Sequence, residues 1–164
     1  MPAGSTYTPI ATQTISGSTT ASATFSSIAG SYTDLVLVVA GTATVSTIDF
    51  LLRFNGDTGS NYSRTYLYGS GSAALSGRTA NATSLGLLSL DTNQQVNIVN
   101  IFNYSNATTY KTAISRINGA VGYGTSAIVG TWRNTAAITS LSVTATTSYF
   151  GSGTTLTLYG IAAA

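Results

Sequence analysis

Few residues of this sequence could act in acid–base or nucleophilic catalysis. The chain contains no His, Cys or Glu, and its carboxylates are Asp34, Asp49, Asp57 and Asp91. Ser-His-Asp and Cys-His systems therefore cannot form, nor can zinc sites that use imidazole or thiolate ligands. A glycosidase needs a pair of carboxylates, but Asp57 and Asp91 lie in turn sequences, where Asp commonly forms local hydrogen bonds. A Ser-Lys dyad with Lys111 is formally possible, although nothing around this lysine resembles such a motif. We expect no enzyme activity and no catalytic residue.

Metal, cofactor and nucleic-acid sites are weakly indicated as well. The segment 55–61, NGDTGSN, could offer oxygen ligands to calcium. A calcium site takes about six to eight oxygens, usually with several carboxylates, so one Asp favours a tight turn instead. The glycines of 69–72 lack the lysine and the following helix of a phosphate-binding loop. The 6 basic residues are scattered singly, whereas a nucleic-acid interface needs them clustered. We expect no metal, no cofactor and no nucleic-acid partner.

The elements that must position any site are short strands. Only 6% of the 164 residues are charged, against roughly 25% in an ordinary domain. The chain holds 22 Ser, 29 Thr and 17 Gly together with 43% apolar residues. This composition is typical of strands and tight turns, and it is not that of a disordered chain. Such sparse charge is explained either by a surface that meets other protein or by a β surface wetted by Ser and Thr.

The chain shows neither a membrane span nor an export signal. Its longest apolar run, 35–40, is far shorter than the roughly 20 residues that a membrane helix needs. The N-terminus has no basic region followed by an apolar core, so it is not a secretory signal peptide. We expect synthesis in a host cytoplasm without Sec-type export, and no membrane partner.

The segments 95–103 and 110–118 predict an antiparallel hairpin at the centre of a sheet. Both are rich in β-branched residues, and the polar stretch between them contains turn-forming residues. In an extended chain successive side chains face opposite ways. Val96, Ile98 and Phe102 then share one face, while Val99 and Ile101 share the other with Asn97 and Asn103. Both faces carry apolar residues, which favours a central position.

Further strands are expected at short spacing on either side of this hairpin. We predict strands at 32–40, 48–54, 64–68, 85–90, 127–133, 138–145 and 155–161. The segments 48–54 and 64–68 are expected to form one hairpin, and 138–145 and 155–161 another. Residues 69–83 read as a long loop that could serve as an interface element, and Gly119, Gly122 and Gly124 mark a second loop.

These elements predict an all-β fold, an antiparallel β-sandwich of jelly-roll type with eight or nine strands. An immunoglobulin-like sandwich is the alternative, and it is weakened by the missing cysteine pair. Residues 31–164 form the sandwich domain. Residues 1–30 are either an edge strand near 8–16 or an arm that orders against a neighbouring subunit.

Aromatic residues are the remaining candidates for a contact surface. Seven tyrosines are expected at strand ends or in loops, where they either cap the core or remain accessible to sugars and protein partners. They are Tyr62, Tyr66, Tyr68, Tyr104, Tyr110, Tyr123 and Tyr149. The single tryptophan, Trp132, follows an apolar run and is predicted to lie in the core or in a subunit contact.

Four segments together resemble small virion proteins of tailed bacteriophages. They are FNGDTGSNYS at 54–63, NYSNATTYKT at 103–112, WRNTAAIT at 132–139 and LYGI at 158–161. These motifs are turns and strand ends, and the resemblance spans residue 32 to the C-terminus. It implies a jelly-roll capsid decoration (cement) protein located at the capsid surface of a virion. The alternative is a tail- or fibre-associated module that binds a receptor or a glycan; a secreted carbohydrate-binding module fits less well, because no signal peptide is seen.

In a decoration role the protein would stabilise the head by binding between subunits of the major capsid protein. Sparse charge and unprotected strand edges favour association, so we also expect a homo-oligomer. Capsids offer local threefold positions, which makes a trimer the expected form. Residues 1–30 and 69–83 are the expected contacts to the capsid or to a sister subunit.

Overall fold

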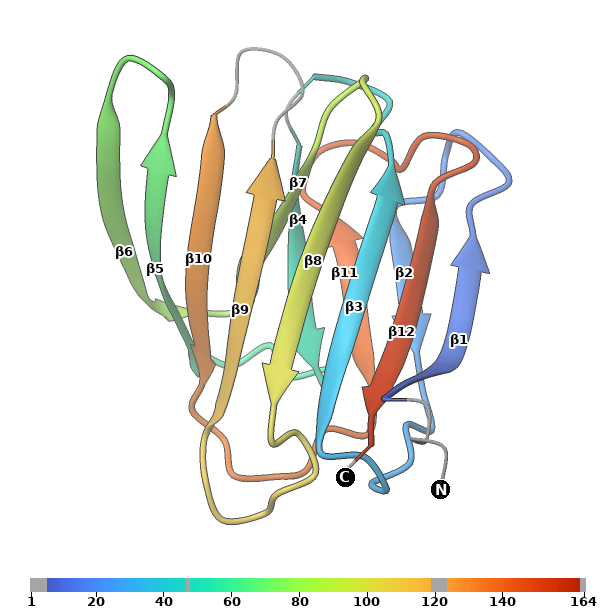
Figure 1. Ribbon diagram of the computed structural model, residues 1–164, viewed down its shortest axis with the longest axis vertical. Coiled ribbons are helices and arrows are strands. Elements are labelled where there is room, and N and C mark those ends of the chain that lie inside the picture. Colours follow the sequence, from blue (N-terminus) through green and yellow to red (C-terminus); the bar gives the residue numbers. More distant parts are fainter. Residues whose placement is uncertain (1–5, 47, 119–123, 163–164) are drawn as a thin grey trace.

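The computed structural model describes residues 6–46, 48–118 and 124–162 and shows a sandwich of two antiparallel sheets (Figure 1). The described residues form twelve strands and no helix. This confirms the predicted all-β sandwich. The strand number exceeds the predicted eight or nine because several short polar strands lack a clear apolar signal.

The larger sheet has eight strands in the order β1-β12-β3-β8-β9-β10-β5-β6. Their bounds are β1 Tyr7–Thr14, β12 Thr155–Ile161, β3 Asp34–Gly41, β8 Gln95–Phe102, β9 Lys111–Asn118, β10 Thr125–Trp132, β5 Tyr62–Gly69 and β6 Ala74–Ala82. The smaller sheet has the order β2-β11-β4-β7. Its strands are β2 Ser22–Phe25, β11 Leu141–Ala145, β4 Ile48–Phe54 and β7 Leu85–Leu90.

Eight of the strands make a regular double-layered frame. We call β1, β12, β3 and β8 together with β2, β11, β4 and β7 the frame. Successive frame strands lie in different sheets except β4 and β7, which both belong to the smaller sheet, and this order is compatible with the predicted jelly roll. The other four strands, β9, β10, β5 and β6, we call the extension. They are inserted into the frame as two pairs, β5 and β6 between β4 and β7, and β9 and β10 between β8 and β11. Figure 1 shows that the β5–β6 hairpin projects beyond the smaller sheet.

The core lies between the inward faces of the two sheets. The burial of each central strand alternates as a two-residue period requires. In β3 and β8, for example, Leu35, Leu37, Val99 and Ile101 are fully buried. Phe50 of the smaller sheet stacks on Phe150 with ring centroids 4.4 Å apart. Burying such aliphatic and aromatic side chains is the main force that holds the layers together.

The predicted central hairpin is confirmed. Strands β8 and β9 pair antiparallel and occupy the two middle positions of the eight-stranded sheet. Asn97, Val99 and Ile101 face the core, while Val96 and Phe102 lie on the outward face and are exposed. The side-chain alternation predicted from the sequence is therefore correct.

The two other predicted hairpins are wrong. Strand β4 pairs with β11 and β7 in the smaller sheet, whereas β5 pairs with β10 and β6 in the larger one. Likewise β11 and β12 belong to different sheets. A turn sequence such as 55–61 is equally compatible with a tight hairpin and with an arch that carries the chain from one sheet to the other. The inward packing of the apolar residues decides between the two.

The predicted long loop at 69–83 is also wrong. Residues 74–82 form β6, the edge strand that pairs with β5. Nearly all of β6 is exposed, so no apolar alternation marks it in the sequence. Pairing with a single neighbour is sufficient to hold it extended.

The N-terminal segment is part of both sheets. Strand β1 lies at one edge of the larger sheet and β2 at one edge of the smaller sheet. Ile15, Phe25 and Ile28 from the same segment are buried in the core. Removing residues 1–30 would thus remove two strands and part of the core. Of the predicted loop after Asn118, residues 119–123 lie outside the described residues.

Candidate functional site

Asp57 has a structural role, because its carboxylate holds the turn at 55–61 together through hydrogen bonds. Its carboxylate accepts hydrogen bonds from Trp132 Nε1 at 2.7 Å, from Asn61 Nδ2 at 2.9 Å and from the Gly59 amide at 2.8 Å. Burial acts to raise the pKa of Asp57, but these hydrogen bonds outweigh it and hold the pKa below the ordinary value. The backbone of the turn adopts positive φ at Asn55 and Gly56, 52° and 66°. Both carboxylate oxygens of Asp57 already have protein donors, as the tight-turn interpretation of 55–61 requires.

Lys111 is also structural. Its side chain is 1% exposed, and its ammonium donates to the carbonyls of Thr109 at 2.7 Å and Thr135 at 3.0 Å. Burial lowers the pKa of Lys111. The ammonium joins the loop before β9 to the loop after β10. Its described hydrogen bonds include no serine hydroxyl, so a Ser-Lys dyad has no geometric support.

The free edge of β7 is covered by side chains of the larger sheet. Ser115 donates its hydroxyl to the carbonyl of Leu87, and Arg64 donates Nη1 to the carbonyl of Gly86. Asn97 donates Nδ2 to the Ser89 carbonyl at 2.9 Å and accepts the Ser89 amide at 3.4 Å. An unpaired strand edge exposes backbone donors and acceptors, and here side chains of three strands satisfy them.

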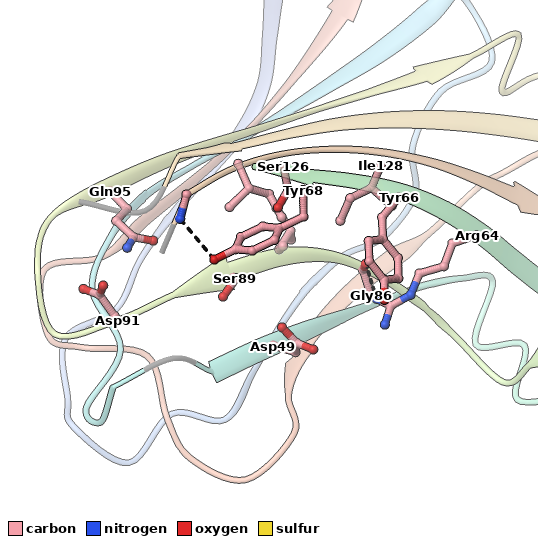
Figure 2. A pocket seen from close by; sticks show the side chains of 13 residues that line it. Asp49, Arg64, Tyr66, Tyr68, Gly86, Ser89, Asp91, Gln95, Ser126 and Ile128 are labelled. Carbon is pink, nitrogen blue, oxygen red and sulfur yellow. Dashed lines mark hydrogen bonds between the residues drawn. The ribbon is translucent and has the colours of Figure 1, made fainter. Parts of the chain in front are cut away.

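A cavity of about 320 Å³ lies where β7 meets the extension. Its walls come from β5, β9 and β10 on one side and from β4, β7 and the start of β8 on the other. Figure 2 shows that Tyr66 and Tyr68 project from β5 into this space and that Asp49 faces them from β4. The polar residues that line it are Asp49, Arg64, Tyr66, Tyr68, Ser89, Asp91, Gln95 and Ser126. The volume falls at the lower end of the ~300–1,000 Å³ typical of small-molecule sites.

Several polar groups of this cavity have no protein partner. Among the described residues, nothing hydrogen-bonds to the Asp49 carboxylate, the Gln95 amide or the hydroxyls of Tyr66 and Ser126. Asp91 uses one carboxylate oxygen to accept the Asn93 amide, at 2.5 Å. Gln95 and Asp91 are only 7% and 3% exposed. The cavity thus gathers free hydrogen-bonding groups from strands that are far apart in the sequence.

The seven candidate tyrosines divide into three groups. Tyr62 and Tyr104 are fully buried and serve the core. Tyr66 and Tyr68 line the cavity, and Tyr68 Oη accepts the Gly124 amide at 3.3 Å. Tyr110 and Tyr149 are exposed, 58% and 42%, while Tyr123 lies outside the described residues. Trp132 is 1% exposed, which confirms its predicted place in the core.

The sequence did not reveal the cavity. Asp49 and Gln95 are 46 positions apart and belong to different sheets, so no local motif connects them. The available signal was weaker: Arg64, Tyr66 and Tyr68 occupy alternate positions of one strand, where an ordinary core would have aliphatic residues. That pattern indicates an inward face that is not fully covered.

The outward face of the eight-stranded sheet is the second candidate surface. Its register aligns Val38, Ile98, Arg116, Ala127 and Leu67 in one row across five strands. The neighbouring row holds Val36, Asn100, Ile114, Val129 and Thr65. Leu67, Val96 and Val129 are exposed by 63%, 51% and 46%. Within the described strands of this sheet, Asp34, Arg78 and Arg116 are the charged side chains that point outward.

No group of three potential metal-binding acidic, His or Cys side chains occurs in the part of the chain that the structure describes. Nor do residues 6–46, 48–118 and 124–162 contain a helix that could cross a membrane. Comparison with protein-family models, with curated proteins and with solved structures found no match to this chain.

Proposed function

We propose that this protein is a non-catalytic structural component of a tailed-phage particle, a decoration protein that binds the capsid through the outward face of its eight-stranded sheet. The sequence resemblance at 54–63, 103–112, 132–139 and 158–161 supports the phage context. The observation that carries the binding mode is the apolar outward face, with three charged side chains across eight strands.

The size of this face suits a protein–protein contact. Eight strands spaced ~4.8 Å apart, 7 to 9 residues long at ~3.3 Å per residue, present roughly 1,000 Å². Each partner in a standard interface contributes about 800 Å². Val, Ile, Leu and Thr side chains on such a face lose few polar contacts when covered. The capsid protein would therefore be bound mainly by burial of aliphatic surface.

The edges of the larger sheet supply a route to self-association. Its outermost strands are β1 and β6, and β6 has a single charged residue, Arg78, to discourage pairing with another chain. We include a homotrimer in the proposal, because a trimer matches the local threefold positions of a capsid. Light scattering at several protein concentrations measures the mass directly; a mass that stays at one chain would remove the trimer from the proposal.

The binding face is tested with Val129→Asp in the full chain. The purified variant is mixed with undecorated heads of the phage that encodes it, and co-sedimentation and cryo-EM are used to measure occupancy. A carboxylate placed beside Ile114 in this row should reduce binding at least about tenfold, since it must be desolvated on contact. Leu67→Asp provides a second variant on the neighbouring strand.

Val45→Asp is the matched control, because Val45 is 47% exposed and lies outside the eight-stranded sheet. It should bind heads as the unchanged chain does. Full binding by both sheet variants would exclude this face. Density for the unchanged protein at the tail tip alone would exclude the decoration role.

A further inference from the structure

We propose that the cavity beside β7 is a binding site for a neutral, hydroxyl-rich ring, a single saccharide unit. This goes beyond a role in capsid decoration and does not depend on it. The site is formed by the extension together with β4, β7 and the first residue of β8, and no residue of the outward sheet face takes part.

Gln95 lines the cavity with an amide that has no protein partner among the described residues. Gln95 is only 7% exposed, yet its side-chain amide makes no hydrogen bond within the described residues. Every described side-chain nitrogen or oxygen that is sealed from solvent does have a partner. Gln95 lines the cavity at the end where Asp91 also lies (Figure 2), so we infer that its amide atoms reach the cavity. Leaving such a group unpaired is costly, so a ligand that pairs with it gains affinity.

The unpaired polar groups of the cavity match the hydrogen-bonding capacity of sugar hydroxyls. A hydroxyl both donates and accepts, and so does the amide of Gln95. The carboxylate of Asp49 and the second oxygen of Asp91 can each accept a hydrogen bond from a hydroxyl. Ser126 and Tyr66 offer two further hydroxyls. Two of these groups, those of Gln95 and Asp91, belong to buried residues, and such groups discriminate strongly against ligands that cannot pair with them.

The cavity also offers aromatic surface. Tyr66 and Tyr68 present two rings to the cavity, and a ring face packs well on the apolar C–H face of a sugar. The Tyr66 ring lies against Gly77 of β6, where any Cβ would overlap the ring. On the opposite wall Gly86 leaves the space in which Arg64 reaches the backbone. These two close approaches fix the cavity wall in place.

Charge argues against an ionic ligand. Asp49 and Asp91 give the cavity two negative charges, and Arg64 gives it one positive charge that is already directed at the Gly86 carbonyl. Phosphates and carboxylates would be repelled by the aspartates. A cation would meet Arg64 in the same wall. A neutral polyhydroxylated ring avoids both conflicts.

The test is a titration of the ¹⁵N-labelled full chain with glucose, galactose, mannose, rhamnose and N-acetylglucosamine, each followed by NMR. At least one sugar should shift the side-chain amide of Gln95 and the backbone amides of Gly86 and Ser89. Asp49→Asn and Gln95→Leu should each weaken that sugar by about tenfold or more. Tyr110→Ala removes an exposed tyrosine outside the cavity and should leave the affinity unchanged.

The outcomes are distinct. Absence of shifts with every sugar at millimolar excess would overturn the proposal, as would shifts that are confined to residues around Tyr110 and Tyr149. Binding of methylamine or phosphate at the cavity in place of the sugars would replace it with an ionic ligand. If Gln95→Leu fails to fold, Asp49→Asn still decides, because Asp49 is exposed and its carboxylate has no hydrogen-bond partner among the described residues.

Discussion

The frame and the extension share one continuous sheet but have different inward faces. In the frame, β12, β3 and β8 present mainly buried Leu, Val and Ile side chains to the smaller sheet. Across the extension the inward face becomes more exposed, from the buried Ser115 in β9 through the half-buried Arg64 and Tyr68 in β5 to Leu75 in β6, which is 57% exposed. The same backbone pairing supports both regions.

The difference follows from how far the smaller sheet reaches. Four strands cannot cover eight, and the cover ends at β7, which contacts β8, β9, β10 and β5. Side chains of the larger sheet must satisfy the β7 edge, so polar residues appear there. Beyond that edge the inward face is open to a ligand. The frame holds most of the buried core, whereas the extension presents an inward face that the smaller sheet does not cover.

Trp132→Ala should have the largest effect, because Trp132 connects the two regions. It lies 5.6 Å from Phe54 of the frame and 6.3 Å from Tyr62 of the extension, measured between ring centroids. Truncation of a fully buried aromatic residue costs about 3–5 kcal/mol of unfolding free energy. Chemical denaturation measures this loss. A change below about 1 kcal/mol would show that the extension is not anchored through this cluster.

Asn97→Leu tests whether the β7 edge depends on its side-chain partners. The substitution leaves the amide and the carbonyl of Ser89 without their partner, and we expect a loss of about 2–3 kcal/mol. Asn100→Leu on the same strand points to the outward face and is the control, with an expected change within about 0.5 kcal/mol. Thermal and urea unfolding measure the stability of both variants. An equal loss of stability in Asn97→Leu and Asn100→Leu would contradict a specific role for the edge contact.

Alkaline pH should loosen the junction between the two regions. Burial raises the pKa of Tyr62 to about 12, against the opposing effect of its hydrogen bond with Phe54. Below its ordinary pKa of 10.0 the phenol is protonated in both the folded and the unfolded chain, so its full contribution to the unfolding free energy is then present. Between that value and about 12 the unfolded chain ionises first, and stability falls by on the order of 2 kcal/mol.

The measurement is the unfolding free energy as a function of pH, compared with that of Tyr62→Phe. Burial also raises the pKa of Tyr104, so the variant should retain part of the alkaline loss. If the unfolding free energy of the variant falls with pH as much as that of the unchanged chain, ionisation of Tyr62 is not the cause of the alkaline loss.

Leu75→Ser should have the smallest effect. Leu75 lies on the uncovered side of the extension, and an exposed substitution of this kind changes stability by less than about 0.5 kcal/mol. Differential scanning calorimetry of the variant provides the measurement. A loss above about 1.5 kcal/mol would indicate that β6 is covered in solution, for example by a second copy of the chain.

Whether a strand is covered by the smaller sheet also decided whether it could be predicted from the sequence. Strand β8 carries strong alternation, so the positions of Asn97, Val99 and Ile101 could be predicted. Strand β6 could not be, because its exposed edge needs no apolar residues. The cavity was missed for a related reason, since Asp49 and Gln95 are brought together only by the packing of one sheet on the other.

The sequence by itself determined the local chemistry of this protein. Alternating apolar residues and abundant turn formers specify short strands, and the absence of His, Cys and Glu limits the side chains available for a reaction. Tertiary structure alone decided which strands are neighbours. Whether a turn such as 55–61 closes a hairpin or crosses between sheets depends on the total apolar area buried, which is a property of the whole chain. For the same reason only the folded molecule shows that the smaller sheet ends at β7 and leaves a cavity beside it.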